Sequence, residues 1–130
     1  MLKGGCLCGA VSVEVDGEVE HQPEACHCSI CRKQSGHVLA AVNVRRDALK
    51  VSGADKVSWY RSSEKVDRGF CSVCGSTLFW KPNMGGYEHT AVAMGVFDGS
   101  TGLRLAKHTF VDDRGDYYEI ADGVTQSDSY

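Results

Sequence analysis

The chain has 130 residues, with 14 Lys and Arg residues against 17 Asp and Glu residues, and its formal net charge is −3. This length is typical of one domain with a modest hydrophobic core. The acidic balance argues against a surface that grips a phosphate backbone, and no apolar run is long enough to cross a membrane. We therefore expect neither a nucleic acid nor a membrane as partner.

A cysteine pair near the start of the chain leads directly into a predicted strand. Cys6 and Cys8 flank a single residue, and the segment 10–16 then alternates three valines with other residues. This period of two is typical of a half-buried strand with the valines on its buried face. The segment 18–21 is a candidate for the returning strand.

Three cysteines stand within six residues in the next motif. In an extended backbone Cys26 and Cys28 point to the same face, and the turn to Cys31 brings a third sulfur back toward them. His27 then faces away from the sulfurs. Three sulfurs can bind a metal ion and leave its fourth coordination position open, and this position is the candidate active site. The polar segment 32–36 that follows fits one helical turn or a loop.

Much of the remaining chain consists of strand-length runs. The run 37–44 is nearly continuously apolar and predicts a strand buried on both faces, while 49–51 and 56–60 enclose a glycine turn and predict a hairpin. The segments 66–70 and 76–80 predict strands on either side of the last cysteine pair. No segment keeps a 3.6-residue apolar period over three turns, so the predicted fold class is all-β.

The C-terminal third continues this pattern. Strand-length runs at 87–96 and 103–111 are separated by a glycine-rich turn, and a last strand is predicted near 117–120. The polar composition beyond it predicts a weakly ordered tail. The expected organisation is therefore a single domain over residues 1–123 followed by a tail over residues 124–130.

The odd number of cysteines, seven, favours metal ligands over disulfides. The N-terminal residues lack the apolar core of a signal peptide, so we expect a cytoplasmic protein whose thiols stay reduced. Two paired knuckles suffice for a closed tetrahedral zinc site. A triplet that borrows a sulfur from one pair is an alternative, although it leaves one thiol without a role. The predicted division is Cys6, Cys8, Cys71 and Cys74 around a structural zinc, and Cys26, Cys28 and Cys31 around a catalytic zinc.

Three cysteine motifs in a fixed order carry a resemblance to a known family. They are C-x-C at residues 6–8, C-x-C-x-x-C at residues 26–31 and C-x-x-C-G at residues 71–75, with further similarity within residues 108–123. Together they resemble the glutathione-dependent formaldehyde-activating enzyme family, also called the GFA or centromere-protein-V-type domain. The resemblance implies a zinc-stabilised β-tent fold of antiparallel sheets with short helical turns, and it implies the same structural and catalytic zinc ligands.

The implied activity is that of a carbon-sulfur lyase. A zinc ion held by three thiolates is soft, so a thiol such as glutathione suits its fourth position and binds there as a thiolate. Attack of this sulfur on a small aldehyde such as formaldehyde gives an S-hydroxymethyl adduct, as in an S-hydroxymethylglutathione synthase. The alternative is a non-catalytic zinc-stabilised binding module, with both metal sites structural and His27 or another side chain as the missing ligand. The sequence indicates no oligomeric state.

Proton transfer and charge balance need further residues, among which the sequence does not choose. Arg32 and Lys33 follow the triplet and could offset its negative charge or hold a substrate carboxylate, with two solvated side chains as the alternative. His27 is a candidate for orienting the ligands on either side of it. The histidines considered for proton transfer are His27, His37, His89 and His108.

Overall fold

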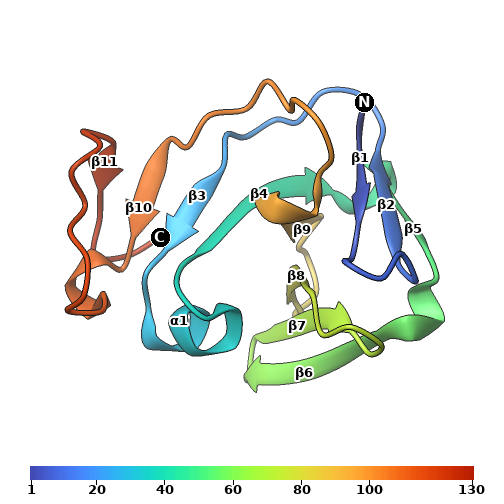
Figure 1. Ribbon diagram of the computed structural model, residues 1–130, viewed down its shortest axis with the longest axis horizontal. Coiled ribbons are helices and arrows are strands. Elements are labelled where there is room, and N and C mark those ends of the chain that lie inside the picture. The colour runs from blue at the N-terminus through green and yellow to red at the C-terminus, as the bar shows by residue number, and fades with distance from the viewer.

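A computed structural model describes all of residues 1–130, and strands make up most of its regular structure (Figure 1). The strands are β1 (Leu2–Gly5), β2 (Ser12–Val15), β3 (Glu24–Cys26), β4 (Leu39–Arg45), β5 (Leu49–Ser52), β6 (Val57–Ser63), β7 (Val66–Cys71), β8 (Thr77–Pro82), β9 (His89–Ala93), β10 (Lys107–Thr109) and β11 (Thr125–Gln126). The helices are α1 (Ser29–Ser35) and the short 3₁₀ helices η1 (Arg46–Ala48), η2 (Ala54–Lys56), η3 (Met94–Val96) and η4 (Val111–Asp113). The predicted all-β fold class is confirmed.

The strands form two sheets. The small sheet has the order β1-β2-β5, and the large sheet has the order β11-β10-β3-β4-β9-β8-β7-β6. In Figure 1 the small sheet stands at the right, and the large sheet runs from β11 at the left through β4 and β9 to β6 at the base. Paired strands are antiparallel, as predicted, except that β10 runs parallel to both β3 and β11.

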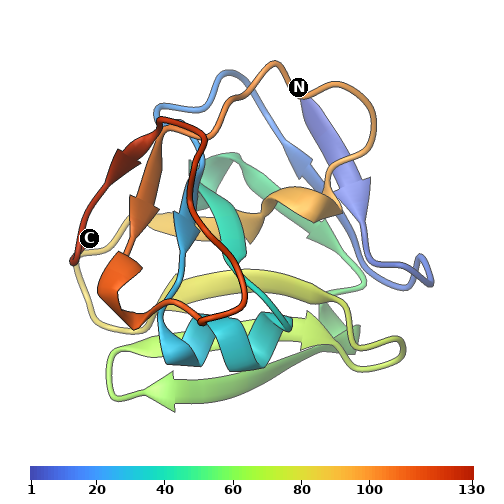
Figure 2. The ribbon, with the colours of Figure 1, turned by 60° about the vertical axis from the view of Figure 1, so that its left-hand side comes forward.

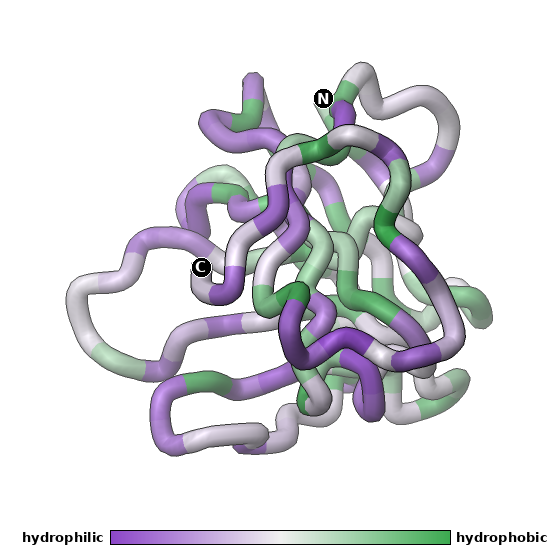
Figure 3. Tube along the Cα trace, turned by 90° about the vertical axis from the view of Figure 1, so that its left-hand side faces the viewer, coloured by the Kyte–Doolittle hydropathy of each residue, from purple (hydrophilic) through white to green (hydrophobic).

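The core includes the inner face of the small sheet and the middle of the large sheet. Val11, Val13 and Val15 are at most 1% exposed, which confirms the predicted alternation. Fully burying one such side chain contributes about 1.5–3 kcal/mol. The same hydrophobic core also contains Val42, Val44, Leu78, Phe79 and Val92. Figure 3 shows polar residues concentrated in the peripheral loops. The predicted returning strand at 18–21 is wrong, because β2 pairs with β1 and β5 instead.

The predicted hairpin over 49–60 is also wrong, because its two strands belong to different sheets. β5 pairs with β2, whereas β6 pairs with β7. Gly53 has a φ of 76°, and a Cβ atom there would lie only 2.0 Å from the backbone oxygen of Ala10. Only glycine therefore fits at this position, where the backbone passes close to Ala10 next to the small sheet. The helix η2 then leads the chain into β6 of the large sheet.

The only α-helix, α1, starts within the cysteine triplet. The Cys28 sulfur accepts a hydrogen bond from the amide of Cys31 at the N-cap, and Gly36 ends the helix with a φ of 90°. Gln34 Nε2 donates to Thr77 Oγ1 at 3.4 Å, which ties α1 to β8. Figure 2 shows α1 in front of the strands at the base of the large sheet. No helix is both long enough and apolar enough to span a membrane.

The C-terminal tail folds back onto the large sheet. The amide of Ser127 donates to the carbonyl of His108 at 2.9 Å, and the amide of Val111 donates to the carbonyl of Ser127 at 3.1 Å. This pairing forms β11, which the sequence did not predict, whereas the strand predicted near 117–120 is absent. The expectation of weak order concerns the motion of the tail in solution and stays a prediction.

Candidate metal and active site

The structure gathers four of the seven cysteines where the two sheets meet. Cys6 and Cys8 lie in the connection from β1 to β2, while Cys71 ends β7 and Cys74 lies in the turn to β8. Their sulfur atoms all lie within 4.8 Å of one another. The Cys6 and Cys8 sulfurs are 3.6 Å apart, and those of Cys8 and Cys71 are 3.8 Å apart. The four-cysteine cluster therefore joins the two sheets.

Backbone amides point at the sulfurs of the four-cysteine cluster. The amide of Val11 donates to Cys6 Sγ at 3.2 Å, and the amides of Val73 and Cys74 donate to Cys71 Sγ at 3.4 and 3.5 Å. Such bonds favour a negatively charged sulfur, because an ionised acceptor strengthens a hydrogen bond. The cluster is thus built to hold thiolates.

Two glycines give the knuckles of this cluster their shape. Gly9 and Gly75 have φ values of 80° and 79°, as expected for a residue that follows a knuckle cysteine. The amide of Leu7 donates to Ser76 Oγ at 3.0 Å, so a direct hydrogen bond also joins the two knuckles. The turn chemistry and the sulfur positions therefore agree.

The other three cysteines form the three-cysteine cluster at the junction of β3 and α1. Cys26 ends β3, Cys28 is the N-cap of α1, and Cys31 lies in its first turn. The sulfurs of Cys26 and Cys28 are 3.4 Å apart, and all three sulfurs lie within 4.8 Å of one another. No His, Asp, Glu or further Cys belongs to this group.

Sulfur separations in both clusters fit a shared cation better than a disulfide. A disulfide requires about 2.05 Å, whereas zinc–sulfur bonds of about 2.3 Å place tetrahedral sulfurs about 3.8 Å apart. All seven cysteines are unbridged. The two clusters can each hold a metal ion, and their donor atoms are those that zinc prefers. The roles of the individual cysteines as ligands stay predictions.

The three-cysteine cluster concentrates negative charge. A hydrogen bond from Cys31 lowers the pKa of Cys26 to about 5, and the same contact together with burial raises the pKa of Cys31. The pair therefore shares one proton, because two neighbouring thiolates repel each other. A cation between the sulfurs would remove this repulsion.

Arg68 on β7 is the positive group that faces this cluster. Its Nη1 and Nη2 atoms both lie 3.4 Å from the Cys31 sulfur, and its Nε donates to Ser62 Oγ at 2.9 Å. Sequence reasoning missed Arg68. The available signal was a cation in a short strand segment between Val66 and Phe70, at a position that shares their face.

A cavity of about 510 Å³ opens beside the three-cysteine cluster, and Cys26 and Cys31 form part of its wall. This volume is within the range of about 300–1,000 Å³ typical of small-molecule sites. More than half of its lining residues are hydrophobic. The titratable side chains in its lining, apart from the cysteines, are His21, Glu24, Lys65, Tyr87 and Tyr130.

Tyr130 comes to this cavity from the tail. Its ring centroid is 5.9 Å from that of Trp80 and 4.8 Å from that of Phe110. Tyr130 is 69% exposed, so its ring lies at the edge of the cavity. The loss of some hydrating water there, with the negative charges of Cys26, Cys31 and Cys28, raises the pKa of Tyr130. Its phenol therefore keeps its proton at neutral pH.

His27 points away from the sulfurs into a hydrogen-bonded chain in which the two histidines are buried, Tyr118 is half-buried and Asp122 is exposed. Its Nδ1 lies 2.6 Å from Tyr118 Oη, its Nε2 lies 2.8 Å from His108 Nδ1, and His108 Nε2 lies 2.8 Å from Asp122 Oδ2. The carboxylate of Asp122 can only accept, so His108 Nε2 donates the hydrogen bond to it. With both imidazoles neutral, His108 Nδ1 accepts from His27 Nε2, and His27 Nδ1 accepts from Tyr118 Oη. With both ring nitrogens occupied, His27 does not complete the three-cysteine cluster.

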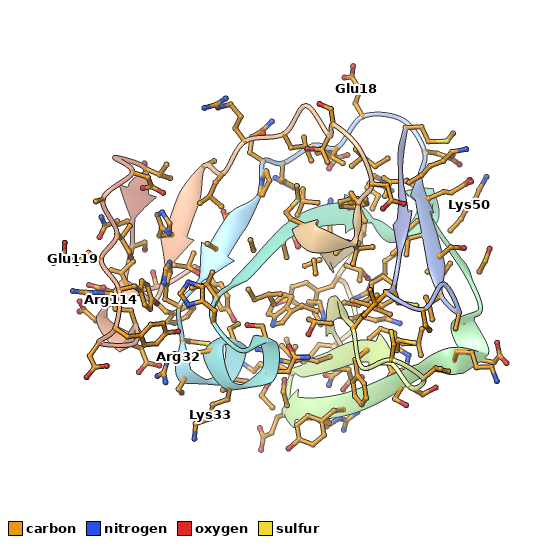
Figure 4. All side chains as sticks on the ribbon, viewed as in Figure 1. Glu18, Arg32, Lys33, Lys50, Arg114 and Glu119 are labelled. Carbon is orange, nitrogen blue, oxygen red and sulfur yellow. The ribbon has the colours of Figure 1, made fainter.

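The other predicted helper residues lie outside the cavity. His37 contacts Tyr117 Oη at 2.7 Å, and His89 contacts Glu20 at 3.1 Å. Figure 4 shows Lys33 pointing outward below α1, and Arg32 Nη2 donates to the carbonyl of Asp113. None of the four histidines considered for proton transfer lines the cavity, whereas His21, which sequence reasoning passed over, does.

Comparisons with known proteins place the chain in a family. The family model described as "Glutathione-dependent formaldehyde-activating enzyme" matches residues 1–113. A Halomonas elongata protein provisionally named for that activity is 38% identical over 86 residues, which cover 61% of this chain and 55% of that protein. An uncharacterised lyase of Schizosaccharomyces pombe is 29% identical over 119 residues, which cover 92% of this chain and 85% of that protein.

A solved structure has the same fold. The crystal structure of a Rhodobacter sphaeroides protein superposes with a TM-score of 0.62 and 29% identity, over 75% of this chain and 89% of that chain. The chain spans about half the length of the Halomonas relative. The family match, by contrast, contains all seven cysteines. The chain therefore belongs to the glutathione-dependent formaldehyde-activating enzyme family.

Proposed function

We propose that this protein is a zinc-dependent carbon-sulfur lyase that adds a thiol such as glutathione to a small aldehyde such as formaldehyde, and reverses this addition. It would bind two zinc ions, a structural one at Cys6, Cys8, Cys71 and Cys74 and a catalytic one at Cys26, Cys28 and Cys31. The unbridged state of all seven cysteines supports action in the reducing cytoplasm.

A single observation carries this proposal: the sulfurs of the three-cysteine cluster have no fourth protein ligand grouped with them, and the cluster borders a cavity. A structural zinc site is normally closed by four protein ligands, whereas a catalytic site keeps one position for substrate. A zinc ion bound at the three sulfurs would take the substrate thiol as its fourth ligand and lower the pKa of that thiol, so that it reacts as a thiolate.

The remaining steps fall to groups in the cavity. The thiolate sulfur forms a bond to the aldehyde carbon, and the electron pair of the C=O π bond moves to oxygen. That oxygen takes up one proton from the solvent, which balances the proton that the thiol released on becoming a thiolate. The protonated phenol of Tyr130 can donate a hydrogen bond to this oxygen. The cavity is open to solvent, and bound substrates would displace water from the apolar part of its lining, which includes Leu39 and Trp80. No oxidant is needed, because the adduct is an isomer of the two reactants.

The test is ¹³C NMR of formaldehyde with glutathione, in which exchange between the free aldehyde and the S-hydroxymethyl adduct is measured with and without the protein. We expect exchange to accelerate with wild type and to return to the uncatalysed rate with Cys28→Ser. A second thiol without carboxylates tests how far the reaction depends on glutathione itself. Unaccelerated exchange for both thiols at high protein concentration would overturn the proposed activity.

The alternative, a binding module with two structural zinc sites, predicts a different metal behaviour. In that case both ions would resist exchange, and added thiol would not change the spectrum of the cobalt-substituted protein. The occupied ring nitrogens of His27 argue against His27 as the fourth ligand, and no other Cys, His, Asp or Glu is grouped with the three sulfurs. A spectral change on adding thiol to a protein with two cobalt ions would favour the enzyme.

A further inference from the structure

Arg68 is a buried cation without a carboxylate partner. Arg68 is only 4% exposed, and it forms no salt bridge with an Asp or Glu. Two other arginines in strands, Arg45 and Arg61, are far more exposed and pair with carboxylates at the surface. The environment of Arg68 thus differs in kind from that of an ordinary surface arginine.

Burial of an unpaired guanidinium is costly, and arginine cannot avoid the cost by losing its proton. The contacts of Arg68 identify what offsets it. Its Nε is bonded to the neutral hydroxyl of Ser62, while Nη1 and Nη2 form a fork around the single sulfur of Cys31 at 3.4 Å each. Cys31 is itself only 2% exposed. The negative charge that balances Arg68 is therefore that of the three-cysteine cluster as a whole, which Arg68 meets at the Cys31 sulfur.

We propose that Arg68 is the positioning residue of the catalytic metal centre: its fork fixes the sulfur of Cys31 toward the other two sulfurs, and its charge makes the centre tolerate an anionic fourth ligand. This role rests on the metal assignment in the proposed function. It extends that assignment by giving a protein residue control over how strongly the centre binds metal and thiol.

A count of charges explains why Arg68 would help the centre accept an anionic fourth ligand. Three thiolates around one divalent cation carry a net charge of about −1, and a substrate thiolate raises this to about −2. A guanidinium in contact with one sulfur returns the sum to about −1. Its two N–H bonds also withdraw electron density from the sulfur, as partners of metal ligands commonly do. Arg68 should therefore strengthen binding of the substrate thiol.

The experiment compares four variants of the full chain. Arg68→Met removes the charge and the fork, and Arg68→Lys keeps the charge without the fork. Ser62→Ala removes the hydrogen bond to Arg68 Nε but leaves the contacts of Nη1 and Nη2 with the Cys31 sulfur. It therefore shows how much the anchoring of the Arg68 side chain matters apart from its contact with the sulfur. Arg61→Met, on the adjacent strand β6, controls for loss of a surface arginine. Metal content, zinc affinity by competition with a chelator, and the spectrum of the cobalt-substituted protein are measured for each.

We expect Arg68→Met to lower zinc affinity at the three-cysteine cluster by about 10–100-fold, with the four-cysteine cluster unchanged. Its sulfur-to-cobalt charge-transfer band should move to lower energy, because the Cys31 sulfur donates more strongly without the fork. Affinity for added thiol should fall as well. Arg68→Lys should lie between wild type and Arg68→Met, and both controls should match wild type in zinc affinity and band energy.

Each contrary result has a defined meaning. Wild type that binds two metals, with affinity and band energy unchanged in Arg68→Met, would overturn the role of Arg68 and leave the proposed function intact. Wild type that binds metal only at the four-cysteine cluster would overturn both. If Arg68→Met does not fold, Arg68→Lys decides, because an unchanged affinity and band energy in that variant would contradict the need for the fork.

Discussion

The two cysteine clusters differ in what they connect. In the four-cysteine cluster, the contact between Cys8 and Cys71 bridges a sequence separation of 63 residues and joins the small sheet to the large one. The three-cysteine cluster spans only residues 26–31, where β3 passes into α1. A link between distant segments removes far more freedom from the unfolded chain than a link within one turn. The four-cysteine cluster is therefore the better placed of the two to stabilise the fold.

The clusters also differ in what surrounds their sulfurs. Backbone amides donate to the sulfurs of Cys6 and Cys71 in the four-cysteine cluster, whereas the buried guanidinium of Arg68 contacts a sulfur of the three-cysteine cluster. Each cluster borders a cavity, through Cys6 in the first and through Cys26 and Cys31 in the second. Side chains can tune a site without altering the fold, and a cavity admits a ligand. The proposed division of roles, stability for the four-cysteine cluster and substrate binding for the three-cysteine cluster, therefore depends on what surrounds the sulfurs, since the ligand atoms are the same.

The largest expected effect comes from breaking the four-cysteine cluster. Cys71→Ser removes a fully buried sulfur that accepts two backbone amides. A structural zinc site contributes about 10 kcal/mol or more of apparent binding free energy, comparable with the whole stability of about 5–15 kcal/mol of a domain. We expect this variant to lose its cooperative thermal unfolding transition, as measured by circular dichroism, together with the metal of that cluster.

A smaller effect on the fold is expected from breaking the three-cysteine cluster. Cys28→Ser should lose one zinc ion and the activity, while the sheets stay folded, because serine is itself a good N-cap for α1. Metal analysis and a thermal melt check this result. Should Cys28→Ser and Cys71→Ser unfold to the same extent, the division into a structural and a catalytic cluster would be incorrect.

Sequence patterns predicted what depends on local spacing. The period of two in the valines of β2 and the C-x-x-C spacing are both properties of short segments, and the structure places their residues as the patterns indicate. The sheet membership of β5 and β6 was wrong because neighbouring strands carry no local signal of which sheet edge they join. Arg68 was missed for the same reason, since its partner Cys31 is 37 residues away and on another element.

The chain of bonds behind His27 provides a test of how the three-cysteine cluster is supported. Tyr118→Phe removes the hydroxyl that donates to His27 Nδ1, and this leaves a buried acceptor unsatisfied. We expect the free energy of unfolding to fall by about 1–3 kcal/mol. Tyr117→Phe is the matched control, because Tyr117 makes the same type of bond to the exposed His37. Equal stability of the two variants in urea unfolding would contradict a supporting role for the hydrogen-bonded chain through His27.

The smallest expected effect is a pH dependence at the far end of the same chain. The amide of Val124 and the imidazole of His108 lower the pKa of Asp122 below its ordinary value of about 3.9. The folded protein thus favours the ionised carboxylate, and this contribution to stability is complete above about pH 3.9 and disappears as the pH falls through the lower pKa of the folded state. Asp122→Asn should therefore be less stable than wild type near neutral pH, and the difference in melting temperature should shrink toward pH 3. Asp116→Asn serves as control, because Asp116 is also exposed but makes no contact with a histidine. A difference of the same size and pH dependence in that variant would assign the effect to net charge rather than to the contact with His108.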